Sequence, residues 1–131
     1  MATNPVQIQL KPCTQLLITC DSHAAYFQRV KLTWNGGGVV FQGSGEGVAM
    51  ATPSGQTLYQ LPGSVPMTVT AQFEYSPTGP GGPFKLAQVV EQPVTHMGQK
   101  TMIIDVTSED SIDKDDNDSY LSLVLIGVKN T

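Results

Sequence analysis

The chain has 131 residues, 40% of them hydrophobic and 14% charged, which suits one folded domain over residues 1–131 and argues against a disordered or membrane-spanning chain. Its 13 glycines and 9 prolines follow no period, which favours many turns and short strands over helices. With 7 Lys and Arg against 11 Asp and Glu, the net charge of −4 argues against a partner that is nucleic acid or an anionic membrane.

The first residues, Met1 to Pro5, lack the basic and apolar regions of a secretory signal. We therefore expect a cytoplasmic protein, and release or surface association by a route without a signal peptide stays open. The only cysteines, Cys13 and Cys20, flank a predicted strand that separates them by roughly 23 Å, too far for a disulfide. We expect two free thiols.

Short apolar or alternating segments recur along the chain with turn residues between them. Nine strands are predicted, at residues 6–10, 15–20, 27–34, 39–42, 57–61, 67–75, 84–90, 101–107 and 120–128. Residues 67–75 alternate strictly between apolar and polar, as in an antiparallel strand with one buried face. Residues 121–126 are apolar at five of six positions, which suits a strand covered on both faces and hints at oligomerisation. The fold class is therefore all-β: a single-domain antiparallel β-sandwich of about nine strands.

Three stretches rich in glycine and proline separate these strands. Residues 76–83 contain three prolines and three glycines and predict a hairpin loop. Residues 36–38 and 43–47 resemble a phosphate-binding loop, but Val48 stands where the dinucleotide motif requires glycine and no helix follows. We predict turns at both places.

Six of the eleven acidic residues fall within ten positions: Glu109, Asp110, Asp113, Asp115, Asp116 and Asp118. They occupy a loop between two apolar strands, where crowded carboxylates repel one another unless a cation neutralises them. Oxygen-only ligands favour calcium over zinc or copper. An EF-hand is rejected because its sixth position should be glycine and its twelfth glutamate, whereas Asp118 and Val124 stand there. The alternative is a solvated acidic turn.

Residues 108–118 read Ser-Glu-Asp-Ser-Ile-Asp-Lys-Asp-Asp-Asn-Asp. This segment resembles the calcium-binding loop of the bacterial calcium-mediated lectins of the LecB (PA-IIL-like) family, approximately Ser-Glu-Asp-Gly-x-Asp-x-Asp-Tyr-Asn-Asp, which bind fucose and mannose. Weaker similarity covers Met1 to Thr3, the strand near residues 15–19 and the Gly63-Ser64 turn. The family fold, a nine-stranded antiparallel β-sandwich, agrees with the strand pattern.

The resemblance implies roles for individual residues of the loop. Glu109, Asp113, Asp115, Asn117 and Asp118 match positions that ligate one or two calcium ions. Asp110 matches a position that accepts a hydrogen bond from the sugar, whose hydroxyls coordinate calcium directly, and Asp113 and Asp115 contact the sugar as well.

Residues 21–25 correspond to the family's loop after the second strand, which carries a calcium-binding Asn and sets sugar specificity. This implies sugar contacts from Ser22, His23 and Ala24, and an additional candidate metal ligand in Asp21. The chain departs from the family at Asp116, where the family has an aromatic residue. It also departs at its end, where Val128 to Thr131 extend beyond the family's terminal glycine, whose carboxylate reaches the neighbouring subunit's site.

Other chemistry finds little support. His23 and His96 lack the spacing of a zinc site, no nucleophile motif is present, and the paired carboxylates are better explained by metal than by glycoside hydrolysis. Trp34 and Tyr26 could stack on a sugar, but the alternation around Trp34 favours core packing.

We therefore predict a non-enzymatic, calcium-dependent carbohydrate-binding protein that recognises fucosyl or mannosyl glycans as a homo-oligomer, a dimer or a tetramer. The alternative is a structural or assembly protein in which calcium only orders the acidic loop.

Overall fold

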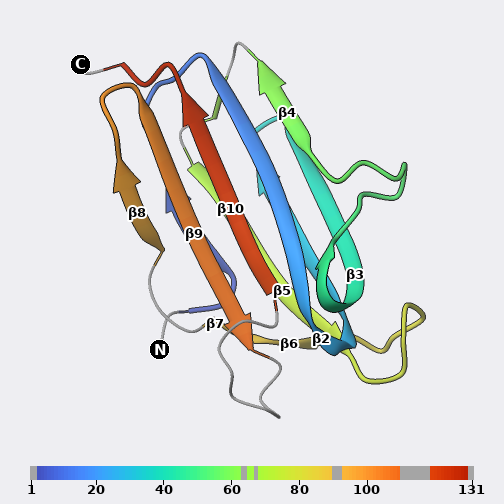
Figure 1. Cartoon of the computed structure of the whole chain (residues 1–131). Coiled ribbons are helices and arrows are strands. Elements are labelled where there is room, and N and C mark those ends of the chain that lie inside the picture. The colour runs from blue at the N-terminus through green and yellow to red at the C-terminus, as the bar shows by residue number, and fades with distance from the viewer. Residues whose placement is uncertain (1–2, 63–64, 67, 90–92, 110–118, 130–131) are drawn as a thin grey trace.

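The computed structural model describes residues 3–62, 65–66, 68–89, 93–109 and 119–129, and within them the chain is all-β, as predicted. Figure 1 shows antiparallel strands stacked in two layers. The described strands are β1 (Val6–Gln9), β2 (Gln15–Trp34), β3 (Gly37–Ala49), β4 (Tyr59–Pro62), β5 (Thr68–Ser76), β6 (Lys85–Leu86), β7 (Gln88–Val89), β8 (Val94–Met97), β9 (Thr101–Glu109) and β10 (Ser119–Ile126). None of the described residues forms a helix long and apolar enough to cross a membrane.

Strand β2 belongs to both layers. Its first half, residues 15–22, pairs with β10, which pairs in turn with β9; β4, β7 and β8 complete this front layer. Its second half, residues 27–33, pairs with β5, which pairs with β1 and β6 in the back layer. β3 follows β2 through the bend, so both strands join the layers along one side of the sandwich (Figure 1).

The core lies between the layers and is built in rows. Alternate residues of β2, β10 and β9 are in register and buried on the inner face of the front layer. The rows are Leu16, Leu125 and Met102; Ile18, Leu123 and Ile104; and Cys20, Leu121 and Val106. Val30, Leu32 and Phe73 are among the buried residues that the back layer contributes to the same core.

The two cysteines are free, as predicted, and both are buried. Burial raises the pKa of the Cys20 thiol well above its ordinary value, and the negative charge of Asp21 adds to the shift. Cys20 therefore acts as a small core residue rather than a reactive thiol.

Several predicted boundaries were wrong. The segments at residues 15–20 and 27–34 form one strand, because residues 21–24 pair with β3 and two register shifts absorb the bend. Residues 43–47 are not a turn but part of β3, where Gly45 and Gly47 take φ of +111° and +65°. Residues 84–90 divide into β6 and β7, and β8 was not predicted. The loop at residues 76–83 was predicted correctly, since it connects the antiparallel pair β5 and β6.

Candidate functional site

The predicted ligand loop lies in the sequence between β9 and β10, and the end of β9 and the start of β10 both lie at the lower end of the sandwich in Figure 1. Of the candidate residues on this loop, Asp110, Asp113, Asp115, Asn117 and Asp118 lie outside the described residues. Glu109 is described: it is the last residue of β9, it stands opposite Gln88 of β7, and only 7% of its surface is exposed. A buried carboxylate thus stands at the entrance to the loop.

The second predicted segment, residues 21–24, reaches the same end of the molecule. Ser22 is in register with Ser119, the first residue after the loop, and Asp21 is in register with Tyr120. This segment is a strand rather than the loop expected from the family resemblance, because β10 pairs with it on one side and β3 on the other. The structure therefore brings Glu109 and residues 21–24 to one end of the front layer.

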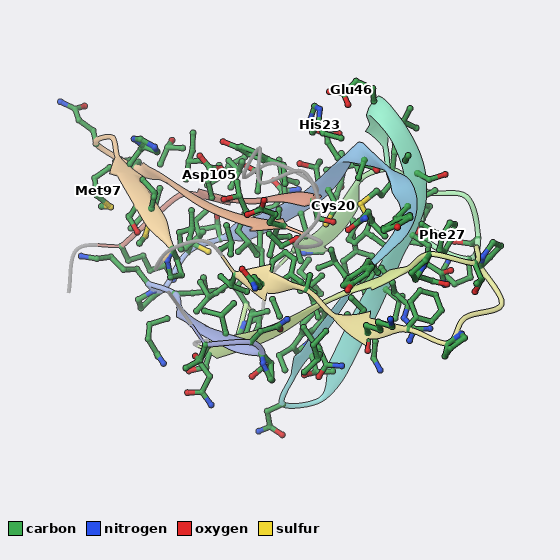
Figure 2. All side chains as sticks on the ribbon, turned by 90° about the horizontal axis from the view of Figure 1, so that it is seen from below. Cys20, His23, Phe27, Glu46, Met97 and Asp105 are labelled. Atoms are coloured by element: carbon green, nitrogen blue, oxygen red, sulfur yellow. The ribbon has the colours of Figure 1, made fainter. Side chains whose placement is uncertain are left out.

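The side chains of this segment differ in what they offer to a ligand. Ser22 and Ala24 are buried, whereas Asp21 and His23 are partly exposed. Nδ1 of His23 lies 3.5 Å from Oε1 of Glu46, a side chain of β3 that is 78% exposed. Figure 2, which views the molecule from this end, shows His23 and Glu46 side by side near the bend of β3. His23 is thus the reachable side chain of the predicted sugar-contact residues 22–24.

The apolar core rows give way to serines at this end. Ser22, Ser119 and Ser108 are in register across β2, β10 and β9, and all three are buried; we call them the serine row. The hydroxyls of Ser22 and Ser108 have no hydrogen-bond partner within the described part of the chain. A row of buried hydroxyls costs stability compared with an apolar row, so its position beside the acidic loop calls for a functional explanation.

Gln28 closes the polar end of the core from the back layer. Its side chain is fully buried, its Nε2 donates a hydrogen bond to the carbonyl oxygen of Tyr26 at 3.2 Å, and its Oε1 accepts one from the hydroxyl of Ser119 at 3.1 Å. Sequence analysis missed Gln28, Ser108 and Ser119. The available signal was that serines continue the apolar alternation of two strands at the ends that meet the acidic loop.

The donor chemistry at this end of the sandwich fits a hard cation. Glu109 supplies carboxylate oxygens and Ser22 and Ser108 supply hydroxyls, and calcium takes six to eight oxygen ligands. Among the described residues, no group of three His, Cys, Asp or Glu side chains could hold a metal ion by itself. A complete ligand set here therefore requires side chains of residues 110–118.

The remaining candidates serve packing or surface roles. Trp34 packs against the core, with its ring 6.1 Å from that of Tyr59, as predicted. Tyr26 stacks on Tyr75 with nearly parallel rings 5.9 Å apart. His96 is exposed, and its Nε2 lies 3.8 Å from Oδ2 of Asp105 on the outer face of the front layer.

Known structures share this fold. A lectin of Chromobacterium violaceum, CV2L, solved with α-methyl-fucoside, superposes with a TM-score of 0.69 at 18% identity, covering 94% of this chain and 96% of that one. The Ralstonia solanacearum high-affinity mannose-binding lectin gives 0.64 at 21% identity, covering 90% and 93%. The C-terminal domain of the Burkholderia cenocepacia lectin BC2L-C gives 0.61 at 18%, covering 95% and 97%. The fold is thus that of a class of bacterial lectins.

The sequence itself places the chain within that class. The family model of fucose-binding lectin II (PA-IIL) matches residues 8–126, so the chain belongs to this family. No curated protein matches the sequence significantly. The family resemblance inferred from the acidic loop is therefore confirmed over most of the chain.

Proposed function

We propose that this protein is a non-enzymatic, calcium-dependent lectin that binds fucosyl or mannosyl glycans. The observation that carries the proposal is the family match over residues 8–126, which makes the chain a member of a family of carbohydrate-binding proteins. The acidic loop supports the calcium requirement, because it concentrates six carboxylates, the buried Glu109 among them, and the buried hydroxyls of Ser108 and Ser119 flank it in the sequence.

The chain's own residues divide the work of binding. Glu109, Asp113, Asp115, Asn117 and Asp118 would hold calcium, with Asp21 as a further candidate ligand. Bound calcium would supply a Lewis acid for two or more vicinal sugar hydroxyls. Asp110, Asp113 and Asp115 would accept hydrogen bonds from those hydroxyls, and His23 would contact the sugar from the neighbouring strand.

Homo-oligomerisation forms part of the proposal, because a single shallow sugar site binds weakly and several linked sites bind by avidity. An apolar row on the outer face of the front layer supports homo-oligomerisation. Leu17, Ile103 and Val124 are in register across β2, β9 and β10, and each is only partly buried. Ile126, one position along the same face, is 39% exposed. A second copy packed on this face would cover the apolar row, as the composition of residues 121–126 suggests.

A glycan array run in parallel with calcium and with EDTA tests the proposal. We expect binding to fucosyl or mannosyl glycans that disappears in EDTA, and calcium-dependent thermal stabilisation that disappears in the double variant Asp115→Ala/Asp118→Ala. Asp105→Asn removes a carboxylate of the outer face and serves as the control that keeps both effects. Calcium-dependent melting without glycan binding would instead support an assembly protein whose loop is ordered by calcium. A double variant that melts like the wild type in both conditions would refute the metal assignment.

A further inference from the structure

Gln28 lies where three parts of the candidate site meet. It follows the register shift of β2 between Ala24 and Gln28, where the strand leaves the front layer for the back layer. Its amide spans the core between the carbonyl group of Tyr26, within the bend, and the hydroxyl of Ser119, which directly follows Asp118 in the chain. One side chain therefore joins the bend after the predicted sugar-contact residues 22–24 to the start of β10, which directly follows the predicted ligand loop in the chain.

An amide at this position is costly as a core residue. Gln28 is fully buried, so its polar atoms are tolerated only because each has a partner. A residue of similar size without polar atoms would avoid that cost, and the next two inward positions of β2, Val30 and Leu32, are aliphatic. The amide is thus matched to its two partners rather than to the core around it.

The two hydrogen bonds have geometric consequences for both segments. Ser119 is 1% exposed and in register with Ser22, so restraining its hydroxyl restrains the end of β10 against β2. The bond to Tyr26 restrains the bend from which residues 22–24 extend. Displacement of either segment breaks one of these bonds and leaves a buried polar atom without a partner, which is energetically costly.

We infer that Gln28 is a positioning residue for carbohydrate binding, whose amide fixes the start of β10, directly after the predicted ligand loop in the chain, relative to the bend that follows the sugar-contact residues of β2. The inference rests on the proposed function, since it assigns Gln28 a role in that site. Gln28 does not touch the sugar or the metal; it acts through Ser119 and through the bend. Its removal therefore weakens sugar binding even where calcium is saturating.

The test is a double-mutant cycle with Gln28→Met and Ser119→Ala, read by isothermal titration with calcium and then with methyl fucoside or methyl mannoside at saturating calcium. Each single variant should lower sugar affinity roughly three- to tenfold, the range expected for one buried hydrogen bond, and the double variant should lose no more than the worse single variant. Ser76→Ala is the matched control. Ser76 stands opposite Phe27 at the bend of β2, and its fully buried hydroxyl contacts Thr78 in the loop between β5 and β6. That control should bind sugar like the wild type.

The outcomes separate the inference from the proposed function. If the wild type binds neither calcium nor sugar, the proposed function fails. If the wild type binds but Gln28→Met binds equally well, or if the two substitutions are additive, the positioning role is refuted. If Gln28→Met melts at a lower temperature than the wild type in EDTA but binds sugar with unchanged affinity, Gln28 contributes to stability only. Should Gln28→Met not fold, Ser119→Ala decides the matter alone, since it removes the same bond by a smaller truncation.

Discussion

The ion pair of Arg29 and Glu74 gives the sharpest test of the packing on the back layer. The two residues stand opposite each other on β2 and β5, with Nε of Arg29 2.5 Å from Oε1 of Glu74. Gln72 donates a hydrogen bond from Nε2 to the other carboxylate oxygen at 2.8 Å. The ring of Phe84 covers the guanidinium group at 3.6 Å from Cζ. Glu74 is itself a buried carboxylate, with only 8% of its surface exposed.

We expect Arg29→Met to destabilise the protein by about 2–3 kcal/mol, because it leaves the buried carboxylate without its cation. Loss of one partner of a fully buried pair costs about 3–5 kcal/mol. The loss expected for Arg29→Met is smaller than that because the Arg29 side chain is 25% exposed and water screens the pair. For a chain of this length the loss corresponds to a fall in melting temperature of roughly 6–12 °C. The double variant Arg29→Met/Glu74→Gln removes the charge as well and should recover most of the loss.

Urea unfolding in EDTA at neutral pH measures these free energies, with the m-value as a check that the unfolded state is unchanged. A loss under about 0.5 kcal/mol for Arg29→Met would mean that water reaches Glu74 freely. A double variant as unstable as the sum of the single variants would contradict the pairing itself.

Other predictions concern a turn and a thiol. Gly127 takes φ of +72° and a Cβ there would collide with the Thr14 hydroxyl, so Gly127→Ala should cost about 2 kcal/mol or more, measured by thermal melting. Gly81→Ala is the neutral control, since its Cβ would meet nothing within 4 Å, and equal melting of the two variants would contradict this reasoning. Burial keeps Cys20 protonated in the folded state after the unfolded chain has ionised, so stability should fall as pH rises above about 9, by up to about 1.4 kcal/mol per pH unit. Cys20→Ala should make that fall shallower, and an unchanged slope between pH 9 and 10.5 would refute it; part of the fall should persist, because burial also raises the pKa of Tyr120.

The all-β architecture could be predicted because a strand with one buried face alternates between apolar and polar residues. Residues 67–75 show this pattern, and Val69, Ala71 and Phe73 are fully buried as it requires. The continuity of β2 could not be predicted, since residues 21–25 have low strand propensity. Their strand structure comes from pairing with β10, which is distant in the sequence, and with β3, whose pairing with β2 is interrupted by register shifts at the bend.

The candidate site was predictable where charge is concentrated and unpredictable where polarity is buried. Six carboxylates within ten residues stand out in any sequence, so Glu109 and the loop were found directly. Ser22 was found only through the family resemblance, and Ser108, Ser119 and Gln28 resemble ordinary strand residues. Their importance arises from register, which places the serines in one row and Gln28 against that row.

The passage of β2 and β3 through both layers has a consequence for dynamics. Residues 21–24 pair with β3 on one side and, over part of their length, with β10 on the other, and β2 and β3 both continue into the opposite layer. The layers cannot separate without breaking these strands, so backbone amides of this segment should exchange with solvent only through global unfolding. A ligand that contacts this segment meets a surface already immobilised before binding, and little conformational entropy remains to be lost in the complex.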